Sequence, residues 1–87
     1  MKNAYNILKY PLSTEKSVKL MQAENKLLFV VSRESTKPQI REAMESTFKV
    51  KVVKVNTQIM PNGKKKAYIK LSPENPAIDI ATQLGMI

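Results

Sequence analysis

Two strand-like segments joined by the sequence Pro-Asn-Gly at 61–63 constrain the fold of this chain more than any other feature. Residues 50–60 and 64–71 alternate apolar and polar side chains, which is the period of a half-buried β-strand. A two-residue turn would mix apolar and charged side chains on the same face. A three-residue loop with its glycine in the left-handed conformation pairs Met60 with Lys64 instead. We predict this register, because a slip of one residue would turn the apolar side chains of one strand away from those of the other.

The predicted register gives the hairpin an apolar face and a polar face. The apolar face holds Val53, Val55, Thr57, Ile59, Ala67, Ile69 and Leu71. The polar face holds Lys54, Asn56, Gln58, Lys64, Lys66, Tyr68 and Lys70. The adjacent Val52 and Val53 break the alternation, which predicts a β-bulge at this point.

The first part of the chain predicts a weak strand and a helix. The strand is expected at 5–9 and the helix at 14–23. Ser13 or Thr14 would be the N-cap of this helix, because their hydroxyl groups accept hydrogen bonds from free backbone N–H groups. Asn25 suits the left-handed residue that ends it.

The middle of the chain predicts a buried strand and the best helix of the sequence. Residues 26–32 (KLLFVVS) are apolar on both alternating faces, as in a central strand covered on both sides. Thr36 and Gln39 have the spacing of a capping box. Apolar side chains then recur at three- and four-residue intervals, which predicts a helix at 37–48.

The last segment predicts a short helix, with Asn75 as its N-cap, Pro76 as its first residue and an end near Leu84. The order is then strand, helix, strand, helix, strand, strand, helix. We therefore expect an α+β fold, an α/β sandwich in which a mostly antiparallel four-stranded sheet carries helices packed on it. At 87 residues, we expect one domain spanning residues 1–87.

Nearly all of the net positive charge falls on the predicted hairpin. The chain carries 15 Lys and Arg against 7 Asp and Glu, a formal net charge of +8. Residues 48–71 alone hold seven Lys and no acid, so the rest of the chain contributes one net positive charge. Such an excess predicts an anionic partner, either nucleic acid or an acidic membrane surface. The alternative is that the lysines only keep a solvated strand pair soluble.

The sequence excludes most kinds of catalytic and metal site. Without Cys or His, the chain lacks a thiolate nucleophile, the usual general base and the commonest metal ligand. Its two Gly residues form no phosphate-binding loop. We therefore expect no enzymatic activity, no cofactor and no metal. An apolar run near 18 residues and a signal-like start are both absent, which predicts a cytoplasmic protein.

The polar face of the hairpin has the side chains of a nucleic-acid platform. Lysines suit phosphates, amides suit sugar or base edges, and the ring of Tyr68 can stack on a base. The chain has 6% aromatic residues and no Trp, which favours structured RNA bound through its backbone over a stacked single strand. The alternative for Tyr68 is that it only covers lysine stems at the edge of the sheet.

Three segments of the chain resemble a known family. YPLSTEKS at 10–17, TKPQIREAMESTFKVKVVKVNT at 36–57 and KKAYIKL at 65–71 resemble the universal large-subunit ribosomal protein L-twenty-three. They occur in the family's order and spacing, and the likeness runs from about Ile7 to Leu84. The resemblance implies an antiparallel sheet with helices around it, binding to large-subunit ribosomal RNA (rRNA), and a position at the exit of the nascent-peptide tunnel.

The resemblance also implies roles for individual residues. By motif, the family's RNA-contacting hairpin corresponds to Lys54, Asn56, Thr57, Lys65, Lys66, Tyr68 and Lys70. With Gln58 and Lys64 of the polar face, these are the RNA-binding residues that we expect. The turn entering the first helix corresponds to Ser13, Thr14, Glu15 and Lys16, near which ribosome-associated factors dock. The implied partners are large-subunit rRNA, neighbouring ribosomal proteins, signal-recognition and nascent-chain factors, and the protein-conducting channel, without direct membrane insertion.

The short hairpin loop departs from one form of this family. Bacterial-type members resembling this chain carry a long loop here that reaches into the tunnel, whereas residues 61–63 close the hairpin at once. The chain is therefore similar to the archaeal type. One alternative is a stand-alone basic adaptor that binds RNA, acidic proteins or membrane surfaces through the same lysines. Another is an RNA-processing enzyme, which would need a base other than His.

Overall fold

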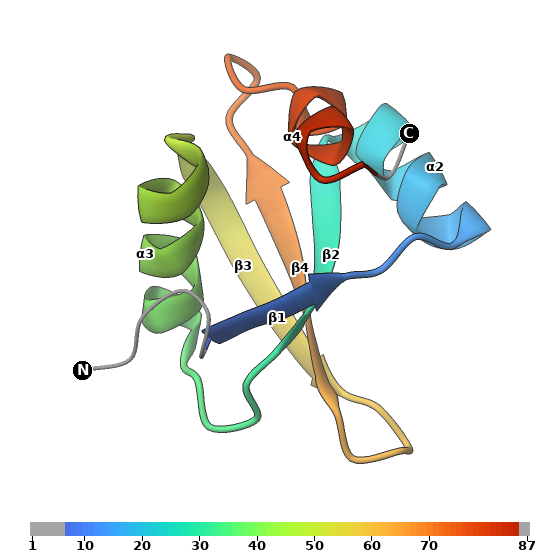
Figure 1. Cartoon of the computed structure of the whole chain (residues 1–87), viewed down its shortest axis with the longest axis vertical. Coiled ribbons are helices and arrows are strands. Elements are labelled where there is room, and N and C mark those ends of the chain that lie inside the picture. The colour runs from blue at the N-terminus through green and yellow to red at the C-terminus, as the bar shows by residue number, and fades with distance from the viewer. Residues whose placement is uncertain (1–6, 86–87) are drawn as a thin grey trace.

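The computed structural model describes residues 7–85 and arranges them as an antiparallel sheet with helices packed on it (Figure 1). The elements are β1 (Leu8–Pro11), α2 (Glu15–Glu24), β2 (Lys26–Val31), α3 (Lys37–Phe48), β3 (Val52–Ile59), β4 (Lys65–Leu71) and α4 (Ala77–Gln83). The strand order in the sheet is β1-β2-β4-β3. The predicted α+β fold and element order are confirmed. Residues 5–6 of the first predicted strand lie outside the described part of the chain.

Both longer helices begin at capping residues that the sequence indicates. Thr14 accepts a hydrogen bond from the Ser17 N–H, and the Ser17 hydroxyl oxygen accepts one from the Thr14 N–H. Thr36 and Gln39 make the same reciprocal pair at the start of α3. These bonds satisfy N–H groups that have no partner within the helix. As predicted, α2 ends at Asn25 in the left-handed conformation, with a φ of 56°.

The hydrophobic core lies between one face of the sheet and the helices (Figure 1). It is built from Ile7, Met21, Leu27, Phe29, Val31, Ile40, Ala43, Met44, Val52, Val55, Ala67, Ile69, Leu71, Ala77, Ile80 and Ala81. Phe48 is partly buried against this core, with its ring centroid 6.3 Å from that of Phe29. Removing these apolar surfaces from water is the main stabilising term of the fold.

The central strand β2 is buried on both faces, as its apolar sequence predicts. Leu27 and Phe29 face the helices and belong to the core. Leu28 and Val30 are also buried but lie outside that cluster, on the opposite face of the sheet. There the cross-strand neighbour of Leu28 is Tyr68.

The hairpin has the predicted register. Met60 N–H donates to the Lys64 carbonyl at 2.7 Å, and Gly63 adopts the left-handed conformation with a φ of 86°. A three-residue loop of this type needs glycine at that position. Ile59 faces the core side, as predicted, but at the end of β3 it is 49% exposed.

The predicted bulge is present, but its two valines are placed the other way round. The register shifts between Val52 and Lys54. Val52 is 2% exposed and takes the core position, whereas Val53 is 50% exposed, so the assignment of Val53 to the apolar face was wrong. The physical reason is that the extra residue of the bulge reverses the alternation before Lys54.

The start of α4 also differs from the prediction. Pro76, not Asn75, is the N-cap, and it makes no side-chain capping bond. The Ala77 N–H instead donates to Asn25 Oδ1 at 2.6 Å. Asn75 Oδ1 accepts from the Lys51 N–H at 2.9 Å, so its side chain holds the approach to β3.

The helices are short. The longest, α3, has 12 residues. No helix within residues 7–85 is long and apolar enough to cross a membrane.

Candidate nucleic-acid interface

The sheet face opposite the hydrophobic core carries the charged side chains of the hairpin. Cross-strand pairing aligns its residues in rows: Lys26–Lys70–Lys54, then Leu28–Tyr68–Asn56, then Tyr10–Val30–Lys66–Gln58. We call the polar residues of this surface the lysine face: Tyr10, Lys26, Lys54, Asn56, Gln58, Lys64, Lys66, Tyr68 and Lys70. The side chains directly opposite one another in such rows lie within interaction distance.

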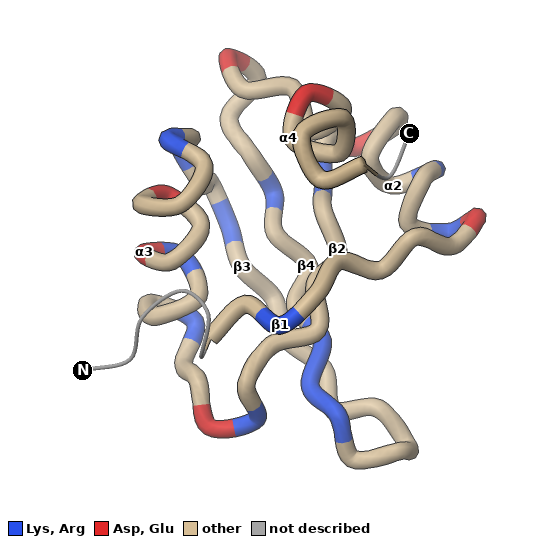
Figure 2. The backbone as a smooth tube through the Cα atoms, viewed as in Figure 1, with Lys and Arg blue, Asp and Glu red and all other residues tan. Residues whose placement is uncertain are grey.

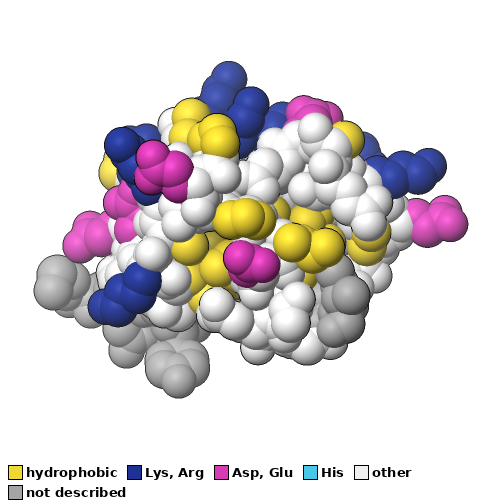
Figure 3. All heavy atoms as spheres, turned by 90° about the horizontal axis from the view of Figure 1, so that it is seen from above, with side chains coloured by type: hydrophobic (Ala, Val, Ile, Leu, Met, Phe, Trp, Pro, Cys, Tyr) yellow, Lys and Arg dark blue, Asp and Glu magenta, His cyan; other side chains and the backbone are white. Residues whose placement is uncertain are grey.

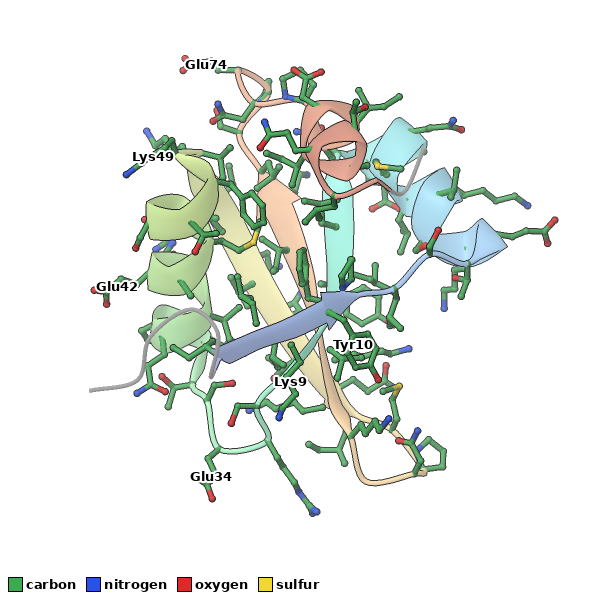
Figure 4. The ribbon with its side chains drawn as sticks, in the orientation of Figure 1. Lys9, Tyr10, Glu34, Glu42, Lys49 and Glu74 are labelled. Atoms are coloured by element: carbon green, nitrogen blue, oxygen red, sulfur yellow. The ribbon has the colours of Figure 1, made fainter. Side chains whose placement is uncertain are left out.

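The four strands described in the structure contain no acidic residue. Figure 2 shows Lys and Arg along β3 and β4, whereas Asp and Glu lie on the helices and loops. Glu42 and Glu74 point outward from α3 and from the loop before α4 (Figure 4). Within residues 7–85, the lysine face has one ion pair, in which Lys26 Nζ lies 3.0 Å from Glu24 Oε1. The remaining lysines therefore create a positive potential that attracts an anionic partner.

Several exposed positive side chains lie on the side of the molecule that faces away from the viewer of Figure 1. Seen from above, they project along the upper border of the view, while other Lys and Arg side chains lie at its left and right ends (Figure 3). Lys54 and Lys70 are exposed and Lys66 is half-buried. Within residues 7–85, no three acidic side chains converge to form a candidate metal centre.

Tyr68 is held by two other residues of the lysine face. Its hydroxyl donates to Gln58 Oε1 at 3.3 Å. Lys66 Nζ lies 5.3 Å from the centroid of its ring, a cation–π distance. This contact is the one expected if Tyr68 covers a lysine. A base that stacked on the same side of the Tyr68 ring would have to displace Lys66.

The hairpin end of the lysine face is tied to β1. Lys64 Nζ donates to the Tyr10 hydroxyl at 3.1 Å and lies 5.6 Å from the centroid of that ring. Arg33, in the loop before α3, places a further positive charge beside the hairpin loop. Its Nη1 atom lies 3.8 Å from the position that a Cβ atom would occupy on Gly63. The positive surface therefore extends beyond β3 and β4.

Two expected RNA-binding residues lie on the other face of the sheet. Lys65 pairs with Val31 and Ile59, and its Nζ donates to the Ser35 carbonyl at 2.6 Å. Thr57 pairs with Ala67 and is half-buried. The structure brings the other seven expected residues together.

The expected factor-docking residues form a separate exposed surface. Ser13, Thr14, Glu15 and Lys16 are all exposed, in the loop after β1 and the first turn of α2. Thr14 is engaged as the N-cap of the helix. Figure 1 shows α2 beside β2, on the opposite side of the molecule from α3 and β3.

Three residues of the positive surface were missed by the sequence analysis: Tyr10, Lys26 and Arg33. The alternation in 26–32 already places Lys26 on the same face as Leu28 and Val30. That signal has no meaning for the hairpin until β2 is known to pair with β4. For Tyr10 and Arg33, the sequence contains no comparable local signal.

Two surface grooves flank the sheet. One, of about 330 Å³, runs between α3 and β3 and is lined by Lys37, Pro38, Arg41, Glu42, Glu45, Val53, Lys54 and Val55. The other, of about 310 Å³, is mostly apolar and is lined by Leu8, Lys9, Tyr10, Pro11, Phe29, Thr47, Phe48 and Leu84. Figure 4 shows Lys9 and Tyr10, two residues of this lining, on β1.

Two comparisons with known proteins identify the family of this chain. Residues 6–70 match the family model described as Ribosomal protein L23. The protein named large ribosomal subunit protein uL23 of Methanococcus vannielii is 45% identical over 84 residues, which cover 97% of this chain and 98% of that protein. The chain therefore belongs to the ribosomal protein L23 family and is similar to an archaeal member along nearly its whole length.

Proposed function

We propose that this chain is a structural constituent of the large ribosomal subunit and binds large-subunit rRNA through its lysine face. The observation that carries the proposal is the alignment of Lys26, Lys70 and Lys54 across three adjacent strands, on a face without helices. Its place of action is the ribosome in the cytoplasm, and residues 1–87 act as one RNA-binding domain. Membership of a ribosomal protein family favours a structural role over catalysis.

The lysine face binds RNA mainly through phosphate groups. Each lysine that neutralises a phosphate releases condensed counterions, which gives binding a strong dependence on salt. Asn56 and Gln58 supply amide groups that can donate to sugar or base edges. Tyr68 is already engaged by Lys66 and Gln58, so its first role is to position those two side chains.

A second surface would serve partners other than RNA. Ser13, Thr14, Glu15 and Lys16 form a docking site for signal-recognition and nascent-chain factors and for the protein-conducting channel, near the exit of the peptide tunnel. Their exposure beside α2, on a different element from the lysine face, supports this part of the proposal. Neighbouring ribosomal proteins are the remaining expected partners.

The RNA proposal is tested by the salt dependence of binding to a folded fragment of large-subunit rRNA. If Lys54, Lys64, Lys66 and Lys70 each neutralise about one phosphate, the logarithm of affinity falls with the logarithm of salt with a slope of magnitude about 3 to 4. Lys66→Gln or Lys70→Gln should each lower that magnitude by roughly 0.7 to 0.9. An unchanged slope in both variants would contradict the proposal.

Lys65→Gln and Lys19→Gln are the matched controls. Lys65 Nζ is bonded to the Ser35 carbonyl on the opposite face, so its replacement should change the slope less than that of Lys66. Lys19 is exposed on α2 and should leave the slope unchanged. Equal effects at Lys65 and Lys66 would mean that the two faces of the hairpin do not act separately in binding.

Sedimentation with large ribosomal subunits distinguishes a structural constituent of the subunit from a stand-alone adaptor. A structural constituent should remain with the subunits after a high-salt wash, because many contacts hold it at once. An adaptor bound through exposed lysines alone should leave, since its binding is electrostatic and is screened by salt.

A further inference from the structure

Lys26 occupies a position on the lysine face that folding alone does not explain. It is directly opposite Lys70 on β4, which is in turn opposite Lys54 on β3. Neighbouring strands are about 4.8 Å apart, so the row places three like charges side by side. Like charges directly opposite one another destabilise a sheet. The electrostatic repulsion within such a row is reduced when an anion contacts its lysines.

One anion already contacts the row. Glu24 Oε1 lies 3.0 Å from Lys26 Nζ, and the side chains of Lys26 and Glu24 are 23% and 49% exposed. Lys54 and Lys70 have no such partner within residues 7–85. The carboxylate thus neutralises one end of the row and leaves the other end free.

The position of Glu24 relative to Lys26 is fixed by the residue between them. Asn25 ends α2 in the left-handed conformation, and its side chain donates to the carbonyls of Leu71, Ser72 and Asn75. Its own carbonyl accepts from the Leu71 N–H at 3.1 Å. The reversal from α2 into β2 is therefore anchored to the end of β4, the strand that carries Lys70.

We infer that Lys26 is an RNA phosphate ligand, and that Glu24 occupies its ammonium group until RNA replaces the carboxylate. The inference rests on the proposed RNA-binding function, whose lysine face includes Lys26, and adds the competition between Glu24 and an RNA phosphate for the Lys26 ammonium group. A surface ion pair contributes only about 0.2 to 1 kcal/mol. A phosphate that contacts Lys26 and Lys70 together can therefore displace the half-buried Lys26–Glu24 pair. Glu24 then acts as a built-in competitor that weakens binding to isolated phosphates.

The experiment measures the salt dependence of binding to the same rRNA fragment for Lys26→Gln, Glu24→Gln and the double variant. Lys26→Gln should lower the magnitude of the slope by about 0.7 to 0.9. Glu24→Gln should tighten binding by roughly 1.5- to 5-fold, the equivalent of one exposed ion pair. In the Lys26→Gln background, the Glu24→Gln change should lose most of this gain, because the competition no longer exists.

Controls on the same helix separate a direct contact from a general charge effect. Glu15→Gln and Lys19→Gln remove the same charges from exposed positions of α2 outside the row. Both should leave affinity and slope nearly unchanged, and urea unfolding of every variant confirms that it is folded. If Glu15→Gln tightens binding as much as Glu24→Gln, the competition is overturned.

Lys70→Gln distinguishes failure of this inference from failure of the proposed function. A lower slope for Lys70→Gln with an unchanged slope for Lys26→Gln overturns the role of Lys26 and leaves RNA binding by the hairpin standing. Unchanged slopes for both variants contradict RNA binding through the lysine face as a whole.

Discussion

Asn25 makes four side-chain hydrogen bonds to residues that are distant in the chain. Its side-chain NH2 group donates to three carbonyls at the end of β4 and in the following loop, at 3.1 to 3.2 Å. Its Oδ1 accepts from the Ala77 N–H, the first residue of α4. The four backbone groups are the carbonyls of Leu71, Ser72 and Asn75 and the N–H of Ala77, and these bonds satisfy them in a partly buried position. One short side chain therefore joins the end of α2 to the start of α4.

Replacement of Asn25 should separate its conformation from its hydrogen bonds. Asn25→Gly keeps the left-handed backbone but removes the bonds, and should cost about 1 to 3 kcal/mol in the free energy of unfolding. Asn25→Ala should cost roughly 1 to 2 kcal/mol more, since alanine resists the left-handed conformation. Urea unfolding measures both. A fully stable Asn25→Gly protein would show that the side-chain bonds contribute nothing.

Lys49 provides the matched control for this prediction. It also ends a helix in the left-handed conformation, with a φ of 57°, and its side chain is exposed. Lys49→Gly should therefore stabilise the protein by up to about 1 kcal/mol, because glycine adopts this conformation without strain. The same substitution to glycine thus has opposite signs at the two helix ends.

At the scale of elements, α3 protects the free edge of the sheet. β3 is an edge strand, which leaves one row of its backbone groups without a neighbouring strand. Arg41 Nη2 donates to the carbonyls of Val52 and Val53 at 2.9 and 3.3 Å. Glu45, one turn later, accepts from the Val52 N–H at 3.0 Å. These two side chains take the place of a partner strand at the bulge.

Removing either side chain should destabilise the α3–β3 contact. Arg41→Ala and Glu45→Ala should each cost about 1 kcal/mol, the usual net value of a hydrogen bond. Glu42→Ala is the control, because Glu42 lies on the same helix and its side chain makes no hydrogen bond to β3. Urea unfolding measures the three variants. Equal midpoints for Glu45→Ala and Glu42→Ala would show that the bond to the bulge does not stabilise the fold.

The features of the fold that could be predicted from sequence depend on residues near one another in the chain. The hairpin register follows from two alternating patterns and from Gly63, and the helix starts follow from hydroxyl groups at Thr14 and Thr36. Val52 and Val53 are chemically identical, so only the three-dimensional contacts of the bulge decide which is buried. The bond from Asn25 to the start of α4 joins residues 52 positions apart, which no local pattern reveals.

As with the fold, the part of the candidate site that could be predicted depends on residues near one another in the chain. Alternation alone places Lys54, Lys66 and Lys70 on one face and Lys65 on the other, and the structure confirms this arrangement. Whether these side chains bind RNA stays a prediction. The row formed with Lys26 requires the pairing of β2 with β4, which places Lys26 beside Lys70, 44 positions later in the chain.

At the scale of the whole molecule, opposite charges occupy different layers. The acids lie on the helices and loops, whereas the open face of the sheet carries Lys26, Lys54, Lys64, Lys66 and Lys70 and no acid of its own (Figure 2). An RNA approaching the sheet therefore meets positive charge, while α2 presents a mixed surface with Glu15 and Lys16 exposed in its first turn. Under the proposed function, the lysine face binds RNA and the start of α2 binds a protein factor.

The separation predicts that variants of the two surfaces affect different partners. Glu15→Ala should leave affinity for the rRNA fragment nearly unchanged and weaken a factor that recognises the start of α2 through charge. Lys70→Gln should weaken RNA binding and leave factor binding unchanged in ribosomes that contain it. Factor binding is measured by pull-down of signal-recognition factors with ribosomes that carry each variant. RNA binding is measured by salt titration of the free proteins with the rRNA fragment.

The competing explanation is that Glu15 only interacts with the helix dipole, a contribution of about 0.3 to 1 kcal/mol to stability. In that case Glu15→Ala would lower the urea midpoint while the ribosomes retain the factors in full, and the docking site on α2 would have to be abandoned.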